Sequence, residues 1–93
     1  MDMDTIIFHD THAYPGCTAI IPENAVVEGT MAPAIAEFSD GAIAMAAFER
    51  LNPDEILIRV DAYTTARGTR IPKKVWRLRY DSSQDLWKVA AKV

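Results

Sequence analysis

The sequence predicts an α+β domain, in which an antiparallel sheet of three to five strands packs on one main alanine-rich helix. Two observations lead to this prediction: apolar residues recur at helical spacing within residues 33–51, and three later segments alternate between apolar and polar residues. The chain has 93 residues, of which 49% are hydrophobic and 25% are charged, a composition typical of a globular protein. We therefore expect residues 1–93 to form a single domain.

The first third of the chain contains short, mostly β-type signals. Residues 5–9 (Thr-Ile-Ile-Phe-His) predict a first strand, and residues 14–16 (Tyr-Pro-Gly) predict a turn. Residues 17–21 and 25–30 leave two alternatives open. Their β-branched residues favour two short strands, whereas Pro22 is also suited to start a helical turn.

Residues 33–51 predict the main helix. Pro33 suits the first helical position, and Asn52-Pro53 suits the end of the helix. Residues 39–41 (Ser-Asp-Gly) interrupt the pattern, because Ser and Asp favour helix starts and Gly disfavours a helix interior. The helix could therefore be limited to residues 40–51. One stripe at helical spacing is formed by Ile35, Phe38, Ala42, Met45 and Phe48.

The second half of the chain predicts three consecutive strands, at residues 55–63, 73–80 and 86–93, with a loop at residues 64–72. The last two strands form a C-terminal β-hairpin joined by residues 81–84. Two registers keep the apolar residues of both strands on one face. One places Arg77 opposite Lys88, and the other places Arg79 opposite Lys88, so Lys88 faces an arginine in both.

Charge is divided between the two halves of the chain. Residues 1–49 hold eight acidic residues and no Lys or Arg, whereas residues 50–93 hold all ten Lys and Arg residues and five acidic residues. Strand alternation gathers several of these cations on one sheet face, where opposed like charges destabilise the sheet. This basic sheet face is the candidate partner-binding site: Arg59, Arg77, Arg79, Lys88 and Lys92.

We expect a small non-catalytic interaction or accessory module, which binds an acidic protein surface, or itself as a homodimer, through the basic sheet face. The alternative source of counter-charge is the acidic first half of the same chain. A weak nucleic-acid binder is a further alternative. The net charge of −3 argues against it, and so does the placement of the aromatic residues, because only Tyr63 shares the basic face.

The second functional hypothesis is a small-molecule-binding domain or enzyme. Its pocket would lie between helix and sheet, lined by Phe38, Met45, Phe48, Trp76, Tyr80 and Trp87.

Other kinds of site have little support in the sequence. His9, His12 and Cys17 carry metal-ligating groups, but their spacing matches no standard zinc signature, so we expect neither a metal nor another cofactor. No catalytic residues are assigned. The acidic start of the chain lacks the features of a secretory signal, no apolar run is long enough to span a membrane, and a lone cysteine cannot form an internal disulfide. We therefore expect a cytoplasmic protein.

Overall fold

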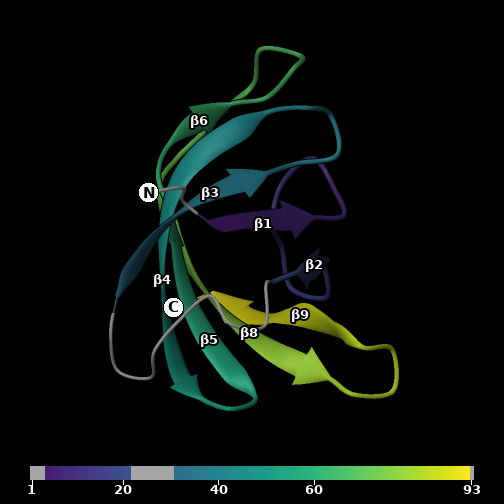
Figure 1. The fold of residues 1–93 in the computed structure, drawn as a ribbon. Coiled ribbons are helices and arrows are strands. Elements are labelled where there is room, and N and C mark those ends of the chain that lie inside the picture. Colours follow the sequence, from purple (N-terminus) through teal and green to yellow (C-terminus); the bar gives the residue numbers. More distant parts are fainter. Residues whose placement is uncertain (1–3, 22–30, 93) are drawn as a thin grey trace.

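The computed structural model describes residues 4–21 and 31–92, which contain strands and no helix. Seven strands form a closed barrel, and two more form a separate two-stranded ribbon, β6–β7 (Figure 1). The prediction of an α+β fold is therefore wrong, and this part of the chain is all-β. The strands are β1 (Asp4–Phe8), β2 (Thr18–Ile20), β3 (Ala32–Glu37), β4 (Ile43–Asn52), β5 (Glu55–Val60), β6 (Tyr63–Thr64), β7 (Arg70–Ile71), β8 (Lys74–Asp81) and β9 (Leu86–Lys92).

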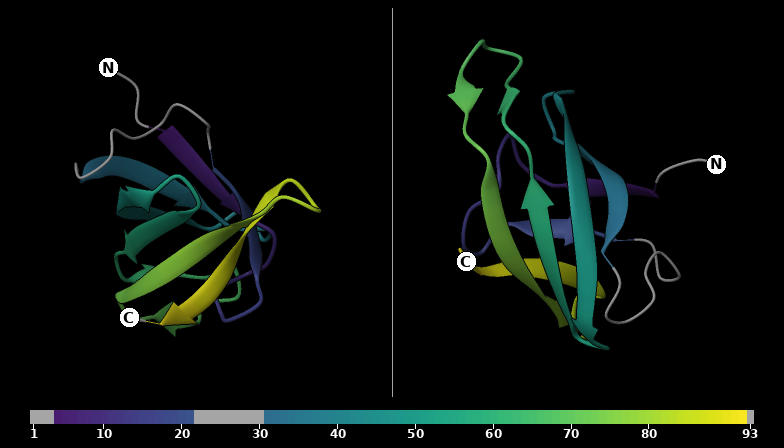
Figure 2. Two further views of the ribbon diagram at one scale, coloured as in Figure 1. Left: turned by 90° about the horizontal axis from the view of Figure 1, so that it is seen from below. Right: turned by 90° about the vertical axis from the view of Figure 1, so that its left-hand side faces the viewer.

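The barrel consists of a five-stranded meander closed by a hairpin. Strands β3, β4, β5, β8 and β9 follow one another as antiparallel neighbours. The β1–β2 hairpin lies between the two ends of this meander, because β2 pairs antiparallel with β9 and β1 pairs parallel with β3. Figure 2 shows the ring of strands in one view, and in the other the β6–β7 ribbon extending beyond the barrel from β5 and β8.

The predicted helix at residues 33–51 is a β-hairpin made of β3 and β4. Residues 39–41, which interrupted the helical pattern, lie in its turn. Gly41 has a positive φ of 88°, which glycine adopts without strain. The Asp40 Oδ1 atom accepts a hydrogen bond from the Ala42 amide at 3.0 Å, a local contact typical of Asp in turns.

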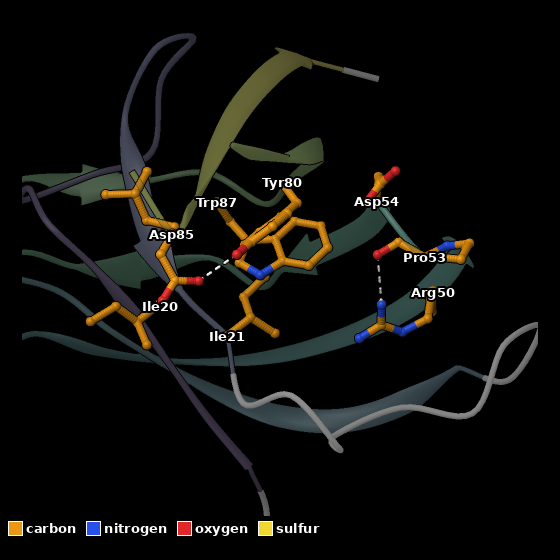
Figure 3. A pocket seen from close by; sticks show the side chains of 9 residues that line it. Ile20, Ile21, Arg50, Pro53, Asp54, Tyr80, Asp85 and Trp87 are labelled. Carbon is orange, nitrogen blue, oxygen red and sulfur yellow. Dashed lines mark hydrogen bonds between the residues drawn. The ribbon is translucent and has the colours of Figure 1, made fainter. Parts of the chain in front are cut away.

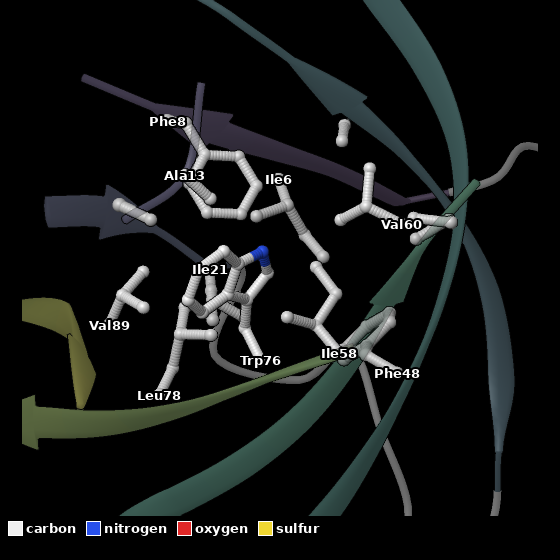
Figure 4. Packing of buried hydrophobic residues seen from close by; sticks show 14 of the residues in the cluster. Ile6, Phe8, Ala13, Ile21, Phe48, Ile58, Val60, Trp76, Leu78 and Val89 are labelled. Atoms are coloured by element: carbon white, nitrogen blue, oxygen red, sulfur yellow. The ribbon is translucent and has the colours of Figure 1, made fainter. Parts of the chain in front are cut away.

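The alanines of this hairpin fill the barrel interior, which explains why a strand pair contains so many helix-forming residues. Ala34 pairs with Ala46 and Ala36 pairs with Ala44 across the two strands, and all four side chains are buried. Large side chains from other strands occupy the rest of the barrel, as Figure 4 shows for Phe8 and Trp76. Small side chains on one wall of a narrow barrel therefore leave room for large ones on the others.

The core runs the length of the barrel and contains no buried polar side chain among the described residues. Near the β6–β7 ribbon, three aromatic rings are stacked. The centroids of Phe8 and Phe38 are 5.1 Å apart, and those of Phe38 and Tyr63 are 4.5 Å apart. Tyr63 is buried and donates a hydrogen bond from its hydroxyl to the Thr11 carbonyl at 3.2 Å. The expectation that Tyr63 lies on the basic face is therefore wrong.

The other predicted strands are present. Strand β1 corresponds to residues 5–9 and β2 to residues 17–21, whereas residues 25–30 lie outside the described part of the chain. The predicted loop at residues 64–72 contains most of the β6–β7 ribbon. Strands β8 and β9 form the predicted C-terminal hairpin, in the register that places Arg79 opposite Lys88.

Candidate functional site

The predicted basic face is the outer surface of strands β5, β8 and β9, which we call the basic wall. Strand alternation places its four described cations outward, while residues such as Ile58, Trp76 and Leu78 point into the core. The side chain of Lys92, the fifth predicted member, is not described. The basic wall is defined by Arg59, Arg77, Arg79 and Lys88.

Three of these side chains contact acidic residues of their own chain. The Glu55 carboxylate lies 4.0 Å from Arg77 Nε and 3.7 Å from Arg79 Nη2, and the Asp81 carboxylate lies 3.4 Å from Lys88 Nζ. Within the described residues, the counter-charge of these three cations therefore comes from β5 and β8, whereas Asp2, Glu23 and Glu28 of the acidic first half lie outside the described part of the chain. Part of the reason for expecting an outside acidic partner is thereby removed.

The pKa values of the two acids agree with these contacts. A hydrogen bond from the Asn52 side chain to Glu55, reinforced by the nearby Arg79 and Arg77, lowers the pKa of Glu55. Hydrogen bonds from Ser83, together with Lys88, lower the pKa of Asp81. Both acids are therefore held in the charged form that pairs with the wall.

The basic wall nevertheless carries more positive than negative charge. Arg77 and Arg79 share the single carboxylate of Glu55, and their side chains are 47% and 64% exposed. Arg59 has no acidic partner within ion-pair distance among the described residues. A hollow of about 410 Å³ on this wall is lined in part by Arg79, Asp81 and Lys88. The wall therefore offers cationic groups beside an accessible depression.

The division of charge along the sequence is also a division in space. Strands β2, β1, β3 and β4 are consecutive neighbours around the barrel, and they lie in the part of the sequence without Lys or Arg except for the last residues of β4, which include Arg50. Strands β5, β8 and β9 complete the circle and carry the basic wall. One side of the barrel is thus free of outward cations, and the other is rich in them.

The six residues of the predicted helix–sheet pocket are not brought together around a cavity. Four of them, Phe38, Phe48, Trp76 and Trp87, are buried, whereas Met45 is exposed on the outside of β4. A small hollow of about 10 Å³ borders Phe38 and Trp76, about the space that one water molecule needs. The interior is otherwise filled by side chains, as Figure 4 shows.

A larger hollow lies at the opposite end of the barrel from the β6–β7 ribbon, and Figure 3 shows it from close by. Its volume is about 460 Å³. The Trp87 ring lies 5.5 Å from the Tyr80 ring and 5.9 Å from the Arg50 guanidinium, and the Tyr80 hydroxyl donates a hydrogen bond to Asp85. The hollow is lined by Ile20, Ile21, Arg50, Pro53, Asp54, Tyr80, Asp85, Leu86 and Trp87.

The candidate metal ligands are engaged in other contacts. His9 Nδ1 lies 2.8 Å from the Thr18 hydroxyl, and the His12 ring packs against Tyr14. Cys17 is buried, and burial raises the pKa of its thiol. Among the described residues, no group of three or more His, Cys, Asp or Glu side chains is arranged to hold a metal ion.

Comparisons with known proteins give no family for this chain, since no protein-family model, curated protein or solved structure matches it. The described residues include no helix with the length and apolar character needed to cross a membrane. Sequence reasoning missed Glu55 and Asp81 as partners of the wall, although alternation in β5 already places Glu55 on the face of Arg59.

Proposed function

We propose that this protein is a small non-catalytic interaction module, which binds an acidic protein surface through its basic wall. The observation that carries the proposal is the sharing of one carboxylate, that of Glu55, by Arg77 and Arg79. Each guanidinium has five N–H donors, and both side chains are substantially exposed. A second carboxylate from a partner can therefore bind these arginines without displacing Glu55.

The filled interior and the alternation of the strands support this proposal. Trp76 and Trp87 of β8 and β9 are buried on the inner side of the barrel, and Tyr80, which borders the hollow on the basic wall, is half-buried. The described part of the wall therefore lacks fully exposed rings on which bases stack. Carboxylates need no such rings, because an arginine binds them through paired hydrogen bonds. An acidic polypeptide is therefore a better match to this wall than a nucleic acid.

Titration of a fluorescein-labelled oligoglutamate peptide, followed by fluorescence anisotropy at low salt, tests the proposal. The double variant R77Q/R79Q should bind this probe at least about tenfold more weakly than the wild type, because one charge-assisted hydrogen bond contributes about 1.5–3 kcal/mol. The variant E55Q should bind it more tightly, since both arginines lose their internal partner. Raising the salt concentration should weaken binding of the wild type.

Arg67 provides the matched control, because it is an exposed arginine in the loop between β6 and β7, away from the basic wall. The R67Q variant removes the same charge and should bind the peptide like the wild type. Equal losses in R67Q and in either wall arginine would show binding to net charge alone and contradict the proposal. Tighter binding of a single-stranded oligonucleotide of equal charge would favour nucleic acid instead.

A second candidate function, binding of a small molecule, is favoured by the hollow beside Trp87. Its volume of about 460 Å³ is within the range of ligand sites, about 300–1,000 Å³, and it combines aromatic rings with a guanidinium. Chemical-shift changes of the Trp87 indole N–H during a screen of aromatic carboxylate fragments would test this function. If the R50Q variant shows the same chemical-shift changes and binds the fragments with unchanged affinity, the hollow beside Arg50 is not their binding site.

Our proposal also places the module in the cytoplasm. The support is the single cysteine, Cys17, which is buried and free, as is usual for thiols in a reducing compartment. Localisation of a fluorescent fusion in the source cells would test this placement.

A further inference from the structure

The outer face of β3, β4 and β5 adjoins the basic wall, with which it shares Arg59. It combines large exposed apolar side chains with this cation and with the acids Glu37, Glu49 and Glu55. Ile43 and Met45 point outward from β4 and are 62% and 49% exposed. The half-buried Ile35 pairs with Met45 from β3. Exposed apolar side chains on adjacent strands indicate an interaction surface.

Two of these charged residues, Glu37 and Arg59, lie beside the exposed apolar side chains and lack ion-pair partners within the described part of the chain. Glu37 is exposed on β3, directly between Ile7 on β1 and Ile43 on β4. Arg59 is exposed on β5, directly between Ala47 on β4 and Val75 on β8. Each is thus a single charge with apolar neighbours on both sides.

The positions of these residues make the face self-complementary. Glu37 lies on β3, directly opposite Ile43 of β4, and Arg59 lies on β5, directly opposite Ala47 of β4. The two charges are therefore on opposite sides of β4. Met45 lies midway between Ile43 and Ala47 along β4. A twofold axis that lies in the plane of the contact over Met45, perpendicular to the line from Glu37 to Arg59, therefore exchanges the position of Glu37 with that of Arg59.

We propose that this face binds a second copy of the chain as a symmetric dimer, in which Glu37 of each copy pairs with Arg59 of the other. Met45 and Ile43 of the two copies then pack in the centre, with the two ion pairs at the ends of the contact. Twofold dimers with such self-complementary contacts are the commonest protein oligomers. This dimer shares Arg59 with the basic wall but leaves Arg77, Arg79 and Lys88 exposed, so it goes beyond the proposed function.

Charge complementarity favours a second copy in this arrangement over other occupants. A dimer centred on Ile7 and Ile43 would bring the two Glu37 carboxylates together on a side of the barrel without outward cations. A contact of about 800 Å² per copy, typical of specific interfaces, is about 15% of the surface area of 5427 Å². Three of the seven barrel strands supply the proposed face.

Charge reversal combined with light scattering after size exclusion tests the dimer. The wild type should have twice the chain mass of 10.3 kDa. The E37R variant places Arg against Arg59, and the R59E variant places Glu against Glu37, so each alone should be monomeric. An equimolar mixture of the two should give dimers, because both contacts then join opposite charges. The double variant E37R/R59E should also dimerise, and R67E should behave as the wild type.

Three results would overturn the proposal: a monomeric wild type up to millimolar concentration, a persistent dimer in E37R or R59E, or species larger than a dimer in the mixture. Circular dichroism melting of each variant establishes that loss of the dimer is not loss of folding. The oligoglutamate titration separates this proposal from the proposed function, because E37R leaves Arg77 and Arg79 intact. A monomeric E37R that still binds the peptide shows that the dimer contact can be lost while Arg77 and Arg79 keep their function.

Discussion

Arg79 lies directly opposite Lys88 across the β8–β9 pair, so two positive charges occupy neighbouring positions of one ladder. Each lies near an acid: Arg79 near Glu55, which it shares with Arg77, and Lys88 near Asp81. The two cations are therefore tolerated because Glu55 flanks Arg79 from β5 and Asp81 of β8 lies diagonally across from Lys88. A partner carboxylate placed between them would contact both.

A double-mutant cycle of R79Q and K88Q should give a repulsive coupling between these side chains of about 0.2–0.5 kcal/mol, since directly opposed like charges destabilise a sheet by amounts of this order. The free energies of unfolding come from urea titrations of the four proteins. The coupling should shrink in 1 M salt, where charges are screened within about 3 Å. An attractive coupling would contradict the observed register.

The G41A variant distinguishes the observed hairpin from the helix that the sequence predicted. Gly41 has a φ of 88°, so an alanine there is strained, and we expect a loss of about 1 kcal/mol or more in the free energy of unfolding. In a helix interior, the same change would instead stabilise by about 0.5–1 kcal/mol. The sign of the change in urea denaturation therefore decides between the two structures.

The helix prediction failed because alanine suits two different environments. Ala34, Ala36, Ala44 and Ala46 are strong helix formers, yet here they occupy the inward positions of two strands, where only small side chains fit. The even spacing of these inward alanines was visible in the sequence, and so was the Ser-Asp-Gly turn. The β8–β9 hairpin was narrowed to two registers because its large residues alternate without ambiguity.

Replacing an inward alanine should therefore be far more costly than replacing an outward one. The A36L variant adds three carbon atoms to the filled core, and we expect its free energy of unfolding to fall by about 1–3 kcal/mol. A90L adds the same atoms to an exposed position on β9 and should change stability by less than about 0.5 kcal/mol. Thermal and urea unfolding measure both, and equal effects would contradict the inward position of Ala36.

Tyr63 should limit stability at alkaline pH. Burial raises the pKa of Tyr63 from 10.0 to about 12, so the unfolded chain loses this proton first, and stability falls as pH rises from about 10 to 12. The Y63F variant should have a free energy of unfolding about 1 kcal/mol lower at neutral pH, because it lacks the hydrogen bond to Thr11. Above pH 10, the difference in free energy of unfolding between Y63F and the wild type should shrink or reverse. Urea unfolding across this pH range measures it.

Cys17 should react slowly with thiol reagents in the native protein. Its side chain is buried, and its thiol lies 3.6 Å from the Thr18 carbonyl and 3.8 Å from the His12 carbonyl. Since burial also raises the pKa of the thiol, the reactive thiolate is scarce. Ellman's reagent should label the native protein many times more slowly than the urea-unfolded protein, and comparable rates would contradict the buried position.

The sequence predicted only part of the candidate site, because the alternation of residues along a strand does not show which strands are neighbours in the sheet. Alternation gathered Arg77, Arg79 and Lys88 on one face, but the acid that pairs with the two arginines, Glu55, is brought to them by the pairing of β5 with β8. The parallel β1–β3 pair, which places Glu37 beside Ile7, likewise joins segments about thirty positions apart.

The closure of the barrel by its β1–β2 hairpin has a consequence for how the chain folds. Thr18 pairs with Lys88, so the last seam joins positions near opposite ends of the sequence. Contacts between such distant positions slow folding, because a long loop must be ordered before they form. During synthesis, each strand from β3 onward can pair with a preceding strand once it has left the ribosome, whereas β2 can pair with β9 only after β9 has left it. We therefore expect closure of the ring by β2 and β9 to be the slowest step of folding.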